Sequence, residues 1–406
     1  MNINFQWLWA GGHWGVQLGY AVYSVATTGV NMRSRLKVFL AFGLIVIAGF
    51  SLSSFANAAD PSIDAAPMPV KSKPVADIPF FLVVDDRLTY AYTFNGTQPG
   101  TYSGGYNGVP ASDKVAKQTY AFTHFDAWAY GTNSLNIGVV KSNHTDPAAP
   151  CIVTDRVAAT AATITALPTG DCAGATDVYS NLRSTFGFNQ IFNTKAFSFG
   201  PLHNVSLEVG GDIGAYNGYT ASAKRAFVSG IQFAFDLPYK GYFNVAPLFY
   251  KEYNHNSYTQ CGALFVSGAC NPDGNKEFNA TWELETNWYM DFGFLPESMR
   301  YFSISGRANL IGPKGPEKGI GVPASVPTVI EYNTEPVRLT FDASKAAFGA
   351  RYSHFVDVWV AYRYWQNKYG YDHSHSGECT VNFIPGGVNT GSCTESSLNA
   401  GVTVKF

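Results

Sequence analysis

The last nine residues of the chain alternate strictly between apolar and polar or small side chains. Leu398, Ala400, Val402, Val404 and Phe406 form the apolar face, and the intervening positions form the other. Successive side chains of a β-strand point to opposite sides, so a period of two indicates a strand with two unlike faces. The pattern predicts a strand that separates an apolar medium from a polar one.

The same alternation recurs along the chain after Pro79, and it predicts twelve strands. An even number of alternating strands of about ten residues is typical of transmembrane β-barrels. Two of the strands alternate poorly, because Phe122 and Phe125 fall on opposite faces and Pro247 predicts a bulge or irregularity in mid-strand. The expected strands lie near residues 82–94, 117–129, 134–142, 177–189, 203–215, 224–236, 241–254, 276–292, 300–311, 335–344, 355–368 and 397–406.

Composition agrees with a barrel that is apolar outside and polar inside. Charged residues make up 14% of the chain and aromatic residues 15%, yet the mean hydropathy is -0.04. We therefore expect an all-β fold, a single twelve-stranded antiparallel transmembrane β-barrel in the bacterial outer membrane. The net charge of -2 argues against a nucleic-acid or anionic-lipid partner. A final strand that ends on Phe406 is the usual signal read by the barrel-assembly machinery, and membrane lipids are expected around the wall.

The first 78 residues divide into three segments that do not belong to the barrel. Residues 38–52 form a short apolar run that follows Arg33, Arg35 and Lys37 and precedes an Ala-x-Ala site at 56–58. This arrangement is typical of a secretory signal peptide, and the run is shorter than the roughly 20 residues that a spanning helix needs. We expect a misassigned start or extension at 1–31, a signal peptide at 32–58 cleaved after Ala58, a flexible tail at 59–78 and the barrel at 79–406.

The connections between the expected strands alternate between long and short. The short ones include 130–133 and 237–240, as expected for periplasmic turns, whereas the long ones are expected outside the cell. The connections at 216–223 and 190–202 fit this contrast less well. The long connections span roughly 95–116, 143–176, 216–223, 255–275, 312–334 and 369–396.

All six cysteines fall in three of the long loops. Cysteine in an exported chain indicates an oxidising compartment, and proximity in sequence favours local pairs among the fifteen possible connectivities. A zinc site is disfavoured because no C-x-x-C spacing occurs. The expected disulfides are Cys151–Cys172, Cys261–Cys270 and Cys379–Cys393.

The polar faces of the strands carry charges of both signs, which we expect to line the lumen. Arg or Lys facing lipid at mid-depth costs about 2–4 kcal/mol. An excess of one sign would indicate an ion-selective pore, whereas mixed signs suit a neutral polar solute. The alternative is that these groups pair across a narrow barrel and only stabilise it. The expected lumen residues are Arg183, Glu208, Asp212, Glu283, Glu285, Arg307, Arg338, Asp342, Trp359, Arg363 and Trp365.

Several short motifs resemble the nucleoside-specific channels of the Tsx type. They are the segment 183–214, the run His124–Gly131, the turn Asp236-Leu237-Pro238 and the triplet Arg363-Tyr364-Trp365. The resemblance runs thinly over residues 80–406 and implies a narrow barrel that passes nucleosides. Trp359 and Trp365 are then candidates for stacking on a base. The long, cysteine-bearing loops depart from the family pattern and leave the solute in doubt.

Other classes of function are less compatible with the sequence. A hydrolase would need a nucleophile motif, and neither G-x-S-x-G nor H-E-x-x-H occurs. We therefore expect no enzyme activity, no cofactor and no metal. A general diffusion porin and a structural or adhesive barrel remain alternatives to a selective channel.

Overall fold

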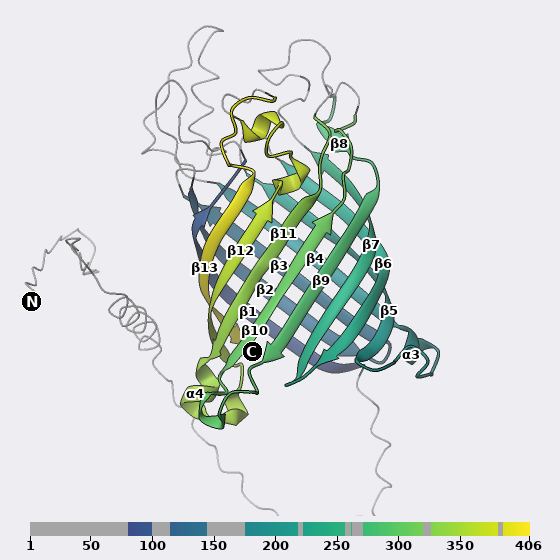
Figure 1. The fold of residues 1–406 in the computed structure, drawn as a ribbon, viewed down its shortest axis with the longest axis vertical. Coiled ribbons are helices and arrows are strands. Elements are labelled where there is room, and N and C mark those ends of the chain that lie inside the picture. The colour runs from purple at the N-terminus through teal and green to yellow at the C-terminus, as the bar shows by residue number, and fades with distance from the viewer. Residues whose placement is uncertain are drawn as a thin grey trace, which may run out of the picture. The chain divides into compact units, whose positions relative to one another are not determined.

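The computed structural model describes residues 80–99, 114–143, 175–217, 222–255, 261, 271–319, 326–380 and 385–406. These residues form one antiparallel sheet (Figure 1). Its strands are β1 (Phe81–Gly96), β2 (Val115–Trp128), β3 (Gly131–Ser142), β4 (Thr176–Gly187), β5 (Leu202–Tyr216), β6 (Ala223–Leu237), β7 (Gly241–His255), β8 (Asn275–Glu277), β9 (Thr281–Asp291), β10 (Phe302–Ile311), β11 (Glu331–Asp342), β12 (Val356–Gln366) and β13 (Thr394–Lys405).

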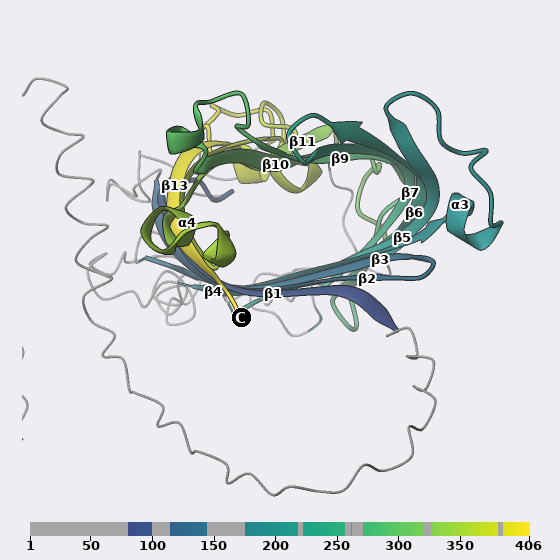
Figure 2. The same ribbon diagram turned by 90° about the horizontal axis from the view of Figure 1, so that it is seen from below.

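Twelve of these strands close into a barrel. Each long strand pairs with its neighbours in the chain, and the ring is completed where β1 pairs with β13. The short strand β8 only extends the edge of β7. Seen from below, the closed sheet has an elongated outline (Figure 2). The predicted all-β barrel of twelve strands is confirmed.

The predicted strand boundaries agree with the structure to within a few residues at most positions. The largest difference is the strand predicted at 276–292, which is divided into β8 and β9. Pro247 interrupts the pairing of β7 with β6 between the pairs Gly230–Leu248 and Phe233–Val245, because proline has no N–H to donate. The register is the same on both sides, so the interruption is not a bulge.

The outer wall of the barrel is apolar and exposed. Leu88, Ile213, Phe227, Trp282 and Val360 each expose more than two fifths of their surface. In water such a wall would be strongly unfavourable, but in a bilayer it is the expected lipid-facing surface. The strands therefore cross the membrane, and the chain is an outer-membrane β-barrel.

The described residues contain no helix that is long and apolar enough to span a membrane. The short helices of this part of the chain lie between strands. They are α3 (Phe188–Ile191), η4 (Glu297–Met299), α4 (Ala343–Phe348), η5 (Ala350–Tyr352), η6 (Lys368–Gly370) and η7 (Gly377–Cys379).

One predicted disulfide is present in full among the described residues. Cys379 and Cys393 are bonded, with 5.4 Å between their Cα atoms. Cys261 is also disulfide-bonded, but its predicted partner Cys270 lies outside the described residues. The predicted pair Cys151–Cys172 lies outside them too, as do the expected extension at 1–31, signal peptide at 32–58 and tail at 59–78.

Candidate functional site: the lumen and its extracellular mouth

Alternation along the strands places all the expected lumen residues on the inner face of the barrel. Arg183, Glu208, Glu283, Glu285 and Trp359 are largely buried, whereas Leu182, Leu207 and Trp282, their neighbours in the chain, are exposed on the outer wall. These residues do not form one site. Most of the charged ones join a network at mid-height, two tryptophans lie apart from it, and Asp342 lies at the periplasmic end.

The network crosses the lumen. Arg183 on β4 donates from Nε to Glu285 Oε2 on β9 at 2.9 Å, although β5, β6 and β7 separate the two strands along the wall. Arg183 also donates to Asp212 on β5 at 3.0 Å. Both partners are nearly inaccessible to solvent, so the pair joins two walls of the barrel through its interior.

Glu285 extends the network to the next strands. Arg307 on β10 donates to both oxygens of Glu285, at 3.0 and 2.6 Å, and reaches Glu335 on β11 at 3.2 Å. Bidentate contacts between guanidinium and carboxylate fix the orientation of both groups. Glu208 lies 3.7 Å from Arg183 and accepts from Gln232 at 2.8 Å. The network therefore contains two guanidinium groups and four carboxylates.

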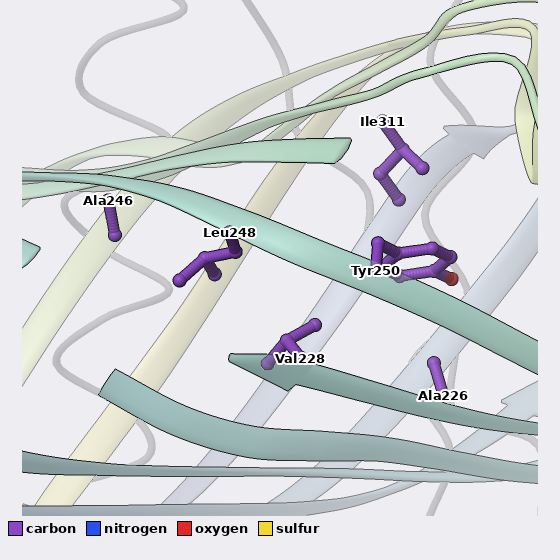
Figure 3. Packing of buried hydrophobic residues seen from close by; sticks show 6 residues of the cluster. All are labelled: Ala226, Val228, Ala246, Leu248, Tyr250 and Ile311. Carbon is purple, nitrogen blue, oxygen red and sulfur yellow. The ribbon is translucent and has the colours of Figure 1, made fainter. Parts of the chain in front are cut away.

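Apolar side chains fill the lumen beside β6 and β7. Val228, Leu248, Tyr250 and Ile311 are buried on the inner side, together with two alanines (Figure 3). The expected polar inner face does not include this cluster. The sequence signal for this cluster is the loss of alternation in two successive strands. Phe227 and Phe249 on the outer face are apolar and exposed, and the buried residues next to them in the chain are apolar too. The cluster therefore makes one part of the inner wall, beside β6 and β7, apolar.

The two candidate stacking tryptophans differ in accessibility. Trp359 is only 4% exposed, its Nε1 donates to Thr403 at 3.0 Å, and the Arg338 guanidinium lies 4.1 Å from its ring centre. Its faces are therefore not open to a solute. Trp365 is half-buried near the extracellular end of β12, and its Nε1 donates to Glu331 at 2.8 Å.

Trp365 is surrounded by cations as well. The Arg363 guanidinium and the Lys368 ammonium each lie 4.5 Å from its ring centre. Arg363 is half-buried and donates from Nε to Asn333 at 3.3 Å. A solute that enters this part of the lumen meets an indole ring together with guanidinium and amide groups.

Asp342 does not belong to the central lumen. It ends β11 on the periplasmic side, where its carboxylate accepts from the backbone N–H of Lys345 and so caps α4. It also accepts from Ser353 and from the backbone N–H of His354. Asp342 therefore holds a periplasmic turn in place.

Two buried lysines cross the extracellular mouth, a feature that the strand pattern does not predict. Lys314, in the loop after β10, donates to Glu252 on β7 at 2.7 Å and to the Tyr369 carbonyl oxygen at 3.2 Å. Lys368, in η6, reaches Glu395 on β13 at 2.5 Å and also donates to the Thr97 carbonyl oxygen after β1. We call residues 312–318 and 367–380, with these contacts, the mouth strap.

The mouth strap links β7 to β13 and β1 above the strands between them. Glu252 and Glu395 are both buried on the inner face, so the two lysines enter the lumen from above. The Cys379–Cys393 bond ties the second half of the strap to the residue that precedes β13. No signal in the strand pattern identifies these loop lysines, because their partners lie far away in the sequence.

No family model matches this chain, and no curated protein sequence matches it. The Tsx resemblance therefore rests on the short motifs alone. Among solved structures, the chain is similar to an outer membrane channel from Pseudomonas putida F1, with 10% identity over 83% of this chain and 100% of that chain and a TM-score of 0.38. It is also similar to the translocator domain of autotransporter NalP from Neisseria meningitidis, with 10% identity over 79% and 88% and a TM-score of 0.33. A third similar structure is LpxR from Salmonella typhimurium, with 11% identity over 79% and 100% and a TM-score of 0.29.

Proposed function

We propose that the chain forms a channel for the passive diffusion of small, neutral, polar solutes across the outer membrane, with nucleosides as the first candidates. The proposal includes no turnover and no cofactor. Lipids contact the outer wall, and the barrel-assembly machinery is the proposed partner for β13, which leads to Phe406. The observation that carries the proposal is the mutual pairing of charges inside the barrel.

Pairing engages both guanidinium groups of the network at mid-height. Arg183 and Arg307 are engaged by Glu285, Asp212 and Glu335. An anion-selective pore would need unpaired cationic rings and a cation-selective pore unpaired carboxylate rings at this level. Neutral solutes with hydroxyl and amide groups are favoured instead.

The side chains that can contact such a solute are fewer than the sequence suggested. Glu285 accepts from two arginines, so it has little capacity for a ribose hydroxyl. Glu335 and Arg363 are half-buried and face the polar part of the lumen. Trp365 supplies an aromatic ring beside Arg363, and stacking of a base on an aromatic ring contributes about 1–3 kcal/mol.

Planar-bilayer recording tests this function directly. The purified chain is inserted into a bilayer, and adenosine or thymidine is added at millimolar concentration. Transient block of the current by both nucleosides is expected, because a selective channel must bind its solute and release it. An unaltered current would exclude nucleosides as the solute.

A general diffusion porin is the second candidate. The mouth strap argues against it, because the strap holds charged side chains inside the extracellular mouth. Liposome swelling with sugars of increasing size separates the two: a general porin admits all small solutes at rates set by size alone. A structural or adhesive barrel would show neither swelling nor nucleoside block.

A further inference from the structure

Apart from Asn254 Oδ1 on β7, three buried side-chain oxygen atoms have no hydrogen-bond partner among the described residues. They are Glu283 Oε2 on β9, Asn309 Oδ1 on β10 and Glu331 Oε2 on β11. Their side chains are 1%, 7% and 3% exposed, respectively. Buried polar atoms are nearly always satisfied in proteins, so three such acceptors on adjacent strands need an explanation.

The register brings these three residues to one level of the wall. Ile311 on β10 is paired with Glu283 on one side and with Glu331 on the other. Asn309 precedes Ile311 by two positions and therefore faces the same side. The acceptors thus share a patch of the inner wall across three adjacent strands, below the mouth strap.

The other oxygen of each carboxylate, Oε1, already accepts a hydrogen bond, and this bond fixes the orientation of the side chain. Asn309 Nδ2 donates to Glu283 Oε1 at 2.7 Å, and Trp365 Nε1 donates to Glu331 Oε1 at 2.8 Å. The arrangement leaves Oε2 of both carboxylates and Oδ1 of the amide as acceptors for which the described part of the chain supplies no donor. A ligand for them must bring positive charge or several donors.

The charges around the patch also lack a counterion. Among the described residues, neither Glu283 nor Glu331 forms an ion pair within 4.0 Å, unlike Glu252, Glu285 and Glu395. Lys224 on β6 faces the same space, but its ammonium pairs with Glu252 at 3.8 Å. A buried carboxylate without a counterion is strongly unfavourable.

We propose that Glu283, Asn309 and Glu331 form a binding site for a hard metal cation, Ca²⁺ in first place. Carboxylate and amide oxygens are the ligands that Ca²⁺ uses, and its coordination geometry is flexible. Mg²⁺ demands a near-octahedral shell and loses its water reluctantly, so it binds such a site less well. The site is independent of the solute that passes through the channel.

Thermal unfolding of the purified full chain in detergent tests the site without any transport measurement. After chelator treatment, CaCl₂ is expected to raise the unfolding temperature of the wild type to a saturating value, and MgCl₂ at the same concentration to raise it less. Glu283→Gln and Glu331→Gln should each weaken Ca²⁺ binding by about tenfold or more, because each removes one charged ligand. Asn309→Ala keeps both carboxylates and should give a smaller loss.

Asp291→Asn is the matched control. Asp291 lies on β9, like Glu283, but at the periplasmic end of the strand, so the variant loses the same charge away from the site. It should keep the full response to Ca²⁺. A wild type that does not respond to Ca²⁺ would overturn the proposal, and so would an undiminished response in the Glu283, Asn309 and Glu331 variants. Neither result bears on nucleoside block, which is measured separately.

Discussion

The Arg183 guanidinium on β4 meets the Glu285 carboxylate on β9 inside the barrel, with 2.9 Å between Nε and Oε2. Because β5, β6 and β7 lie between these strands along the wall, the ion pair is a contact across the lumen and not along the sheet. It limits the passage and holds two walls of the barrel together.

Removing one partner of this pair should destabilise the barrel. Arg183→Met leaves Glu285 and Asp212 buried without one of their cations, and breaking a buried pair costs about 3–5 kcal/mol. Urea-induced unfolding of the barrel in lipid vesicles measures the change. Arg225→Met is the control, because Arg225 bonds to Asn275 at the exposed extracellular rim. A similar loss of stability in both variants would contradict a special role of the crossing pair.

The mouth strap should restrict current through the channel. Lys314→Met and Lys368→Met each remove an ammonium group that anchors a loop to the inner wall. Single-channel recordings of both variants are expected to show higher conductance than the wild type. Lys345→Met, which removes a half-buried lysine at the periplasmic end, should leave the conductance unchanged. If both strap variants conduct like the wild type, the strap does not restrict the ion current through the mouth.

The three predicted disulfides can be mapped directly. Non-reducing peptide mapping should recover Cys151–Cys172 and Cys261–Cys270 beside Cys379–Cys393, and a bridge between two different loops would contradict local pairing. Cys379 and Cys393 are 14 positions apart. Closing a loop of about 15 residues stabilises a protein by about 3 kcal/mol, so the Cys379→Ser/Cys393→Ser double variant should unfold at lower denaturant.

The strands were predictable because each must present unlike faces to lipid and to the lumen. This requirement produces an alternation with a period of two in the sequence. The final strand, β13, shows it most clearly. The pattern fails where the inner face is apolar. On β7, Leu248 and Tyr250 are buried inside while Phe249 is exposed outside, so alternation disappears although the strand continues.

The partners of the inward charges could not be predicted from the same pattern. Alternation gives the face of Arg183 and Glu285, but their contact depends on how the closed sheet brings β4 toward β9. The strap contacts of Lys314 and Lys368 depend in the same way on the fold of the loops. The solvent accessibility of the inward side chains could not be predicted from alternation either. Trp359 and Trp365 share an inner face, but only Trp359 is covered by its neighbours.

The periplasmic turn should make stability depend on pH. His354 Nδ1 donates to the Asp357 carboxylate at 3.0 Å, and this hydrogen bond and the nearby carboxylates raise the pKa of His354 above its usual value. The charged groups around the ring are Asp291, Asp342 and Asp357, and the Tyr289 hydroxyl lies 3.1 Å from Nε2.

A raised pKa in the folded state means that the folded protein holds the His354 proton more tightly than the unfolded chain. The resulting stabilisation is fully present below the unfolded pKa of about 6.5 and is lost as pH rises through the folded pKa. The difference in unfolding free energy between wild type and His354→Gln should therefore be largest in mildly acidic solution and shrink above neutrality. Urea unfolding across this pH range measures it, and a constant difference would contradict the assignment.

Trp365 should matter for nucleoside block, whereas an equally large side chain on the outer wall should not. Trp365→Ala removes the half-buried indole ring beside Arg363 inside the lumen, so nucleosides should block the current more weakly, with ionic conductance similar or higher. A loss of about 1–3 kcal/mol of stacking corresponds to a weakening of block by roughly 5- to 150-fold. Trp282→Ala removes an indole that is 47% exposed to lipid on the outer wall, so block should remain as in the wild type. Equal block in the Trp365 variant and the wild type would show that nucleosides, if they bind, do not stack on this ring.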